Sequence, residues 1–303
     1  MNRKEYIENK KLEKHEKLLN KLFNKEYDLM IFDIGACEGE SSIRYKQQFK
    51  NAQIHLFEPL PNNVKLIEDN IKTYQVNNFI VTQKCLSNQL GKVDFFVSSG
   101  NPNNIDNNED WDYGNKSSSL LEPNKTLEIH DWLKFKDKIE VETSTIDNYC
   151  AEKKITTIDF IHMDVQGAEL MVLEGAKSML QKIQAIWLEV ENVELYKNQP
   201  IKTDIEAFLE NNNFIKVIDT VNDVAGDQFW VNQQLYSKKT IVVKINILNE
   251  RYSNYLEFLQ SIQFRCLSFL AYAPQSNNFA MRAETDSSSS KNCFSSSSLG
   301  TGF

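Results

Sequence analysis

The sequence is poor in the residues that build disulfide frameworks and metal centres. Its five cysteines are odd in number and scattered, no C-x-x-C pair is present, and its four histidines never recur at metal-ligand spacing. We therefore expect free thiols, a reducing compartment and no dedicated metal site. The cysteines are Cys37, Cys85, Cys150, Cys266 and Cys293, and the histidines are His15, His55, His130 and His162.

Long apolar runs are also missing. Residues 1–23 are charged throughout and lack the apolar stretch of roughly 7 to 15 residues that marks a secretory signal. The most apolar segment, residues 255–273, is interrupted by charged and amide side chains, whereas a membrane-spanning helix needs about 20 apolar residues. We expect a cytoplasmic protein with no transmembrane segment, and the sequence leaves its oligomeric state open.

Positive charge is scarce as well. The net charge is -8 and the pI is near 5.2, and binding to a nucleic-acid duplex by counterion release needs a basic face. We therefore expect no nucleic-acid partner and favour a small-molecule or glycan acceptor. The phosphate-loop motif G-x-x-x-x-G-K-[ST] and the nucleophile elbow G-x-S-x-G are both absent, which argues against those two classes of enzyme.

The sequence does have the alternation of an α/β domain. Between residues 27 and 232, short apolar runs alternate with helical stretches, which predicts βαβ units and a parallel sheet covered by helices. The runs IDFIHMD and AIWLEV are apolar nearly throughout, as in strands buried on both faces. We divide the chain into an N-terminal helical extension (1–25, with an amphipathic helix over 3–24), the α/β domain (26–237), a C-terminal extension (238–272) and a serine-rich flexible tail (273–303).

A polar segment, residues 98–126, interrupts this alternation. It is rich in Asn, Ser, Asp, Pro and Gly and contains Trp111 and Tyr113. Long loops in compact domains are usually functional or disordered, and the sequence leaves both possibilities open.

The first strand ends in a glycine turn, Asp33-Ile34-Gly35-Ala36-Cys37-Glu38-Gly39. Open α/β sheets bind ligands beyond the carboxyl ends of their strands. Cys37 and Glu40 replace the second and third glycines of the dinucleotide fingerprint, and the acidic groups around the turn would repel a pyrophosphate. S-adenosylmethionine, which carries an ammonium and a sulfonium, is therefore favoured over NAD. We assign Asp33, Gly35, Ala36 and Gly39 to the cofactor site.

The second strand ends in Glu58-Pro59, and Glu58 lies 23 residues after Gly35. An acidic side chain at roughly this interval accepts hydrogen bonds from ribose hydroxyls. We expect Glu58 to face the crevice and not the core, although it could also cap the next helix or be solvated. Pro59, and Ser87 after the apolar run FIVTQKCL, join the predicted cofactor site.

Three blocks in order resemble the FkbM family of methyltransferases. They are DIGACEG, FEPLPNN, and IDFIHMDVQGAELMVLEGA with AIWLEV, set against the family's D-x-G-A-N-x-G, F-E-P-x-P, D-x-x-K-x-D-x-E-G-A-E-x-x-x-L-x-G-A and E-V. The resemblance implies a Rossmann-like, seven-stranded, mostly parallel sheet with an antiparallel terminal strand and helices on both faces. It also implies S-adenosylmethionine as methyl donor and a sugar, glycolipid or polyketide hydroxyl as acceptor. The departures are Cys37 for Asn, His162 for Lys and Gln166 for Glu.

Polar residues gather at the ends of two later strands. His162 and Asp164 alternate to one side of IDFIHMD, and Glu189 and Glu191 share a side of AIWLEVE. Methyl transfer to a hydroxyl needs alignment and a base, for which Asp164 and His162 are the candidates. His162 could equally be a core residue and Asp164 a helix cap or cofactor ligand, and we take Glu169 as structural.

A second class of function also fits these departures. The protein could be a non-catalytic binding module that keeps the cofactor fold and recruits a partner through residues 98–126 and its C-terminal tail.

Deleting residues 273–303 should leave folding and cofactor binding nearly unchanged. A serine-rich segment with few apolar anchors buries too little surface to offset the entropy of ordering it. Thermal unfolding and calorimetry with S-adenosylmethionine on the full and shortened chains measure this, and a large fall in melting temperature would contradict it.

Overall fold

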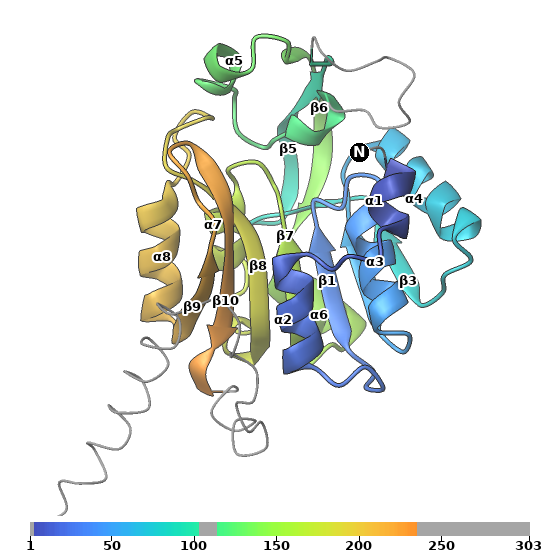
Figure 1. Cartoon of the computed structure of the whole chain (residues 1–303). Coiled ribbons are helices and arrows are strands. Elements are labelled where there is room, and N and C mark those ends of the chain that lie inside the picture. Colours follow the sequence, from blue (N-terminus) through green and yellow to red (C-terminus); the bar gives the residue numbers. More distant parts are fainter. Residues whose placement is uncertain (1–2, 103–113, 235–303) are drawn as a thin grey trace, which may run out of the picture. The chain divides into compact units, whose positions relative to one another are not determined.

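The central element is a seven-stranded sheet with the strand order β3-β2-β1-β7-β8-β10-β9 (Figure 1). The computed structural model describes residues 3–102 and 114–234. Strand β10 is antiparallel to both of its neighbours and the other strands run parallel to one another, which confirms the predicted fold class. The strands are β1 (Met30–Ile34), β2 (Gln53–Phe57), β3 (Phe79–Thr82), β7 (Ile158–Met163), β8 (Ile183–Glu191), β9 (Phe214–Asp219) and β10 (Ala225–Asn232).

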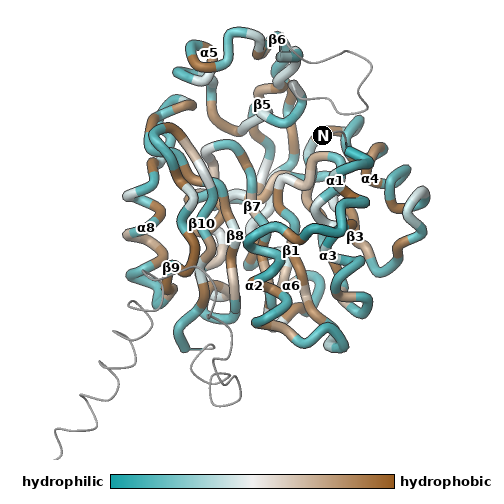
Figure 2. The backbone as a smooth tube through the Cα atoms, viewed as in Figure 1, coloured by the Kyte–Doolittle hydropathy of each residue, from teal (hydrophilic) through white to brown (hydrophobic). Residues whose placement is uncertain are grey.

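Successive side chains of each strand point to opposite faces of this sheet, and an apolar core lies on each face. Phe32 and Ile161 pack on one face, with α6 (Ile146–Lys153), α7 (Glu169–Glu174) and α8 (Lys202–Asn211). Ile31, Phe160 and Trp187 pack on the other, with α2 (Lys14–Leu22), α3 (Glu40–Gln48) and α4 (Pro61–Thr73). Figure 2 shows apolar residues concentrated along the central strands. Strands β7 and β8 are buried on both faces, as the sequence predicted.

A second, three-stranded sheet with the order β4-β6-β5 was not predicted. Its strands are β4 (Cys85–Leu86), β5 (Gly91–Ser99) and β6 (Lys134–Ser144), and β5 and β6 rise beyond one end of the main sheet (Figure 1). Val93, Phe95 and Val97 recur at every second position of β5, a period-two signal that could have revealed it. These residues pack with Leu60, next to the end of β2.

The described part of the predicted loop over residues 98–126, which leaves out residues 103–113, contains regular structure. Ser98 and Ser99 complete β5, Gly114–Ser117 forms a 3-10 turn, and Ser119 bridges to Phe96. A short helix, α5 (Thr126–Ile129), ends the segment. Trp111 and Tyr113 lie outside the described residues, as do Cys266, Cys293 and the predicted segments 238–272 and 273–303.

Helix α7 is shorter than the predicted helical stretch AELMVLEGAKSMLQ. It ends at Glu174, and the chain continues through turns and a 3-10 segment, Leu180–Lys182. A Cβ atom on Gly175 would lie 2.1 Å from the carbonyl oxygen of Ser87, so only glycine permits this close approach.

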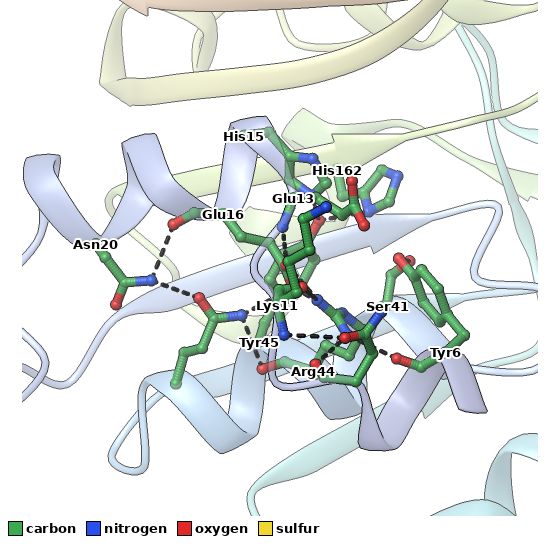
Figure 3. Close-up of polar contacts among 12 residues, drawn as sticks. Tyr6, Lys11, Glu13, His15, Glu16, Asn20, Ser41, Arg44, Tyr45 and His162 are labelled. Carbon is green, nitrogen blue, oxygen red and sulfur yellow. Dashed lines mark hydrogen bonds and ion pairs between the residues drawn. The ribbon is translucent and has the colours of Figure 1, made fainter. Parts of the chain in front are cut away.

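The single helix predicted over residues 3–24 is wrong, because the segment forms two helices, α1 (Arg3–Glu8) and α2. The guanidinium of Arg44 on α3 donates hydrogen bonds to the carbonyl oxygens of Tyr6 (2.6 Å), Asn9 (2.9 Å) and Lys11 (3.3 Å) (Figure 3). The backbone carbonyl groups between α1 and α2 thus accept hydrogen bonds from a side chain of α3 in place of helical N–H groups. Leu19 of α2 is buried in the core beside Trp187, so this helix is part of the layer that covers the sheet.

A buried ion pair anchors this N-terminal segment. Arg44 is 3% exposed and Glu16 of α2 is 1% exposed, and the guanidinium Nε donates to a Glu16 carboxylate oxygen at 2.8 Å. Within residues 3–102 and 114–234, no helix combines the length and the apolar character needed to cross a membrane.

Replacing Arg44 by Met should reduce the free energy of unfolding by about 3 to 5 kcal/mol, because it leaves the Glu16 carboxylate buried without its partner. The double change Glu16→Gln with Arg44→Met should recover part of this loss. Urea unfolding measures both. Lys197→Met breaks an ion pair whose two side chains are each 52% exposed, and it should have almost no effect. An Arg44→Met loss no larger than that of Lys197→Met would contradict the prediction.

Candidate functional site

A pocket lies where the carboxyl ends of β1, β2 and β7 meet the second sheet. The space that its walls outline, about 520 Å³, includes open solvent at the mouth of the pocket. The crevice beyond the carboxyl ends of parallel strands is where the glycine turn predicted a ligand. The lining residues are Ile34, Gly35, Cys37, Phe57, Glu58, Pro59, Leu60, Asn63, Lys84, Cys85, Leu86, Phe95, Asn115, Lys116, Ser118, Asp164, Val165 and Gln166.

Gly35 brings two walls of this pocket together. Its φ is +81°, and a Cβ atom there would lie 1.8 Å from the carbonyl oxygen of Asp164. Only glycine allows the end of β7 to come this close to the turn after β1. The N–H groups of Gly35 and Ala36 both donate to the carbonyl of Phe57, at 3.0 and 3.1 Å, which fixes the turn to the end of β2.

Glu58 is held by the backbone on both sides of the pocket. One carboxyl oxygen accepts from the N–H of Cys37 at 3.0 Å, and the other accepts from the N–H of Leu60 at 2.8 Å. The side chain is 4% exposed, and burial raises the pKa of Glu58 to about 8. The side chain of Asn63 forms a third hydrogen bond to this carboxyl group, and because a carboxylate has about four acceptor positions it can accept one more. It lines the pocket, as predicted, but it is more deeply buried than an open crevice position implies.

The acidic groups of the turn do not give the pocket a negative surface. None of Asp33, Glu38 and Glu40 is a lining residue, and each already has a partner. The argument that these acids disfavour a pyrophosphate is therefore wrong, since the charges of Glu38 and Glu40 are balanced locally. Asp33 accepts from the hydroxyl of Ser42 at 2.6 Å, Glu38 pairs with Arg3, and Glu40 pairs with Lys116.

Three other predicted cofactor residues support the pocket from outside its lining. Ala36 is buried in the core under α3, and Gly39, with φ at +75°, begins that helix. Ser87 is buried, and its N–H donates to the carbonyl of Ser144 at 2.8 Å. The two residues before Ser87, Cys85 and Leu86, do line the pocket.

Asp164 is an exposed carboxylate on the pocket wall, and its neighbour Gln166 holds it. The amide nitrogen of Gln166 donates to Asp164 at 2.8 Å and to Glu189 at 2.7 Å. Burial and nearby carboxylates raise the pKa of Glu189 well above its ordinary value. Asp164 and Glu189 thus meet at one donor, as the strand alternation suggested, whereas Glu191 is buried.

His162 is not among the lining residues. Its Nδ1 lies 2.8 Å from the hydroxyl of Tyr45, which lies 3.0 Å from Nε2 of His15 (Figure 3). His15 in turn stacks on Trp187, with ring centroids 4.6 Å apart. Burial lowers the pKa of His162, so this ring is neutral near pH 7. The histidine faces the layer between the sheet and helices α2 and α3.

Glu169 has the structural role that the sequence indicated. Its carboxylate accepts from the N–H of Val165 at 2.9 Å, closing the turn that begins α7. No cluster of three or more His, Cys, Asp or Glu side chains suited to a metal ion occurs in the part of the chain that the structure describes.

Several lining residues were not predicted individually. Asn115, Lys116 and Ser118 come from the polar segment 98–126, which the embedded aromatics marked as a candidate substrate loop. Phe95 comes from the second sheet, and Asn63 follows the FEPLP motif. The amides of Asn63 and Asn115 are mutually hydrogen-bonded, which joins α4 to the segment that lines the pocket.

The sequence matches a known family of methyltransferases. The chain matches the methyltransferase FkbM domain over residues 33–216. It is 31% identical over 209 residues to the 2-O-methyltransferase NoeI of Sinorhizobium fredii, covering 69% of this chain and 81% of that protein. It is 26% identical to the methyltransferase sdnD of Sordaria araneosa, covering 66% and 78% of the two chains. Among solved structures, M. capricolum TrmK with S-adenosylhomocysteine aligns over 88% of this chain and 90% of its own, at 13% identity and a TM-score of 0.38.

The family match runs from Asp33 in the glycine turn to Lys216 in β9, and so contains Glu58 and Asp164, which line the pocket from opposite strands. The same three sequence blocks that resembled the family surround this pocket in the fold. The chain belongs to the FkbM family, and it is an S-adenosylmethionine-dependent methyltransferase.

Proposed function

We propose that this enzyme methylates a hydroxyl group of a sugar or another small molecule. The observation that carries the proposal is the exposed carboxylate of Asp164, which lines the same pocket as Glu58 and the glycine turn. A relative that shares 31% identity is a 2-O-methyltransferase. A non-catalytic binding module is the weaker alternative. Gln166 is one of the departures from the family pattern that suggested it, yet its side chain forms a hydrogen bond with Asp164, the candidate base.

The pocket residues fit S-adenosylmethionine. Glu58 lines the pocket beside Gly35 and Cys37, and its carboxyl group would accept a hydrogen bond from the ribose. Among the other predicted cofactor residues, Pro59 would contact the nucleoside, while Asp33, Ala36, Gly39 and Ser87 would keep the walls in place. When bound, the cofactor supplies an electrophilic methyl group.

Asp164 would act as the general base. It lies on the wall of the pocket beside Gly35, and a carboxylate there can take the proton of an acceptor hydroxyl as its oxygen becomes methylated. His162 is the second candidate, but its Nδ1 is engaged by Tyr45 and the residue does not line the pocket. Much of the rate enhancement would come from holding the acceptor in line.

The pocket lining is rich in amide and hydroxyl side chains, which lie beside the charged Lys84, Lys116 and Asp164. Asn63, Asn115, Ser118 and Gln166 line the pocket, and amide and hydroxyl groups form hydrogen bonds with sugar hydroxyls. The net charge of -8 disfavours a nucleic-acid acceptor. Both observations support a glycan or a small polyol.

A panel of acceptors tests the function directly. Transfer of labelled methyl from S-adenosylmethionine should be detected on methyl glycosides of neutral hexoses and 6-deoxyhexoses, and should be lost on the matching 2-deoxy sugars. Asp164→Asn should lower kcat by roughly 10² to 10⁴, the usual contribution of a general base, with an unchanged Kd for the cofactor. Asp69→Asn, on exposed α4, is the matched control. Full activity of Asp164→Asn would rule out this carboxylate as the base.

At pH 9, where the Glu58 carboxyl group is ionised, Glu58→Gln should weaken S-adenosylmethionine binding about five- to 150-fold, equivalent to about 1 to 3 kcal/mol, because charge-assisted hydrogen bonds become neutral ones. Because the pKa of Glu58 is raised to about 8 and the carboxylate is the stronger acceptor, wild-type affinity should increase as pH rises from 6 to 9. Calorimetry on both proteins measures this.

The Glu58→Gln variant also serves as the control for the pH series. The amino group of the cofactor titrates equally with either protein, so only a difference between the two pH profiles reports on Glu58. Its melting temperature should fall as well, since an amide cannot accept from both Cys37 and Leu60. Equal affinities of the two proteins, with parallel pH dependence, would remove Glu58 from the cofactor site.

A further inference from the structure

Gln166 occupies an unusual backbone position beside the pocket. Its φ is +54°, in the left-handed region that non-glycine residues seldom adopt. The hydroxyl of Ser119 donates to its carbonyl at 2.7 Å, and Gly167 follows with φ at +94°. Such a conformation persists only where the surroundings fix it, and it often occurs at functional sites.

The side chain of Gln166 is held as firmly as its backbone. Its amide nitrogen has two protons and donates to two carboxyl groups, those of Asp164 and Glu189. Its amide oxygen accepts from the hydroxyl of Tyr196 at 3.0 Å. The opposite amide orientation would turn the oxygen toward two acids, so the carboxyl groups themselves determine which end faces them.

We propose that Gln166 is a positioning residue that holds the carboxylate of Asp164 toward the acceptor in the pocket. This inference rests on the proposed function, in which Asp164 is the base. A side chain that carries two donors on one nitrogen hydrogen-bonds Asp164 and Glu189 at once, so the two carboxyl groups can lie close together. The Asp164 carboxylate keeps its second oxygen for the acceptor hydroxyl.

The anchor of Gln166 extends to the segment that lines the opposite wall. The single O–H of Tyr196 is shared between the Gln166 amide oxygen and the carbonyl oxygen of Ser117, which is 2.8 Å away, and the next residue, Ser118, lines the pocket. Together with the bond from Ser119, these contacts join Gln166 to the polar segment over the cofactor site. The orientation of Asp164 therefore depends on two walls of the pocket at once.

The departure from the family pattern has a physical explanation here. A glutamate at position 166 would place a third carboxylate against Asp164 and Glu189 and would offer them no donor. The lysine of the pattern is likewise replaced by His162, which burial keeps neutral. Relative to the family pattern, this site therefore lacks both the negative charge of the glutamate and the positive charge of the lysine. The other acids near this pair are Glu169 of α7, Glu191 of β8 and Asp227 of β10.

Two substitutions test the inference with the acceptor found in the panel. Gln166→Leu removes both donors, and Gln166→Glu keeps the shape but replaces the donors by charge. Both should lower kcat about 10- to 100-fold, as misplacement of a reacting group does, while the Kd for S-adenosylmethionine stays within about twofold. In Gln166→Glu the acidic limb of the pH–rate profile should also move to higher pH, because a third acid retains protons in this cluster.

Three controls separate positioning from folding. Gln181→Leu removes an exposed glutamine whose amide donates to the carbonyl of Asn212 far from the pocket, and its kcat should be unchanged. Tyr196→Phe removes the hydroxyl that contacts both the Gln166 amide oxygen and the Ser117 carbonyl but keeps the two donors of Gln166, and it should cause a smaller loss of kcat. Melting temperatures identify any variant that fails to fold, and Tyr196→Phe then decides the question.

Crystal structures of the wild type and of Gln166→Leu give a result that needs no acceptor. The Asp164 carboxylate should turn away from its wild-type position in the variant. An unmoved carboxylate, or a kcat equal to that of the wild type, would overturn the positioning role and leave the proposed function intact. If the wild type binds S-adenosylmethionine but methylates no member of the panel, the proposed function fails, and this inference fails with it.

Discussion

The close approach of two chain segments at Gly35 is the constraint on which the site depends. The carbonyl oxygen of Asp164 occupies the space in which any other residue at position 35 would place its Cβ atom. Parallel pairing of β1 with β7 brings these segments together, and the absence of a side chain lets them touch. The glycine turn and the carboxylate proposed as base therefore share one pocket wall.

Buried polar groups around this contact are matched one by one. Glu58 accepts two backbone N–H groups, and the acids of the glycine turn pair with Arg3 and Lys116. The N-terminal helix α2 is part of this arrangement, because its Glu16 forms a buried ion pair with Arg44 of α3. An excess of acidic residues in the sequence thus does not give a strongly acidic pocket, because the cations that balance them come from distant parts of the chain.

The second sheet contributes pocket residues that do not belong to the seven-stranded sheet. The seven-stranded sheet and its glycine turn supply one side of the pocket, and β5 with the segment around Asn115 supplies much of the rest of the lining. Loops and small sheets placed at the strand ends vary without disturbing the core. The acceptor would accordingly be selected by residues outside the blocks that identify the family.

The sequence by itself determined the order of strands and helices, the glycine turn and the place of Glu58, because hydrophobic periodicity and short motifs are local properties. Even so, it missed β5, although Phe95 follows a period-two pattern. Only the tertiary structure decided which polar groups meet. The hydroxyl of Tyr45 contacts His162, 117 residues later in the chain. Arg44 donates to the carbonyl of Asn9, 35 residues earlier, just after the end of α1. Such pairings depend on how the elements pack in space, and no local pattern in the chain encodes them.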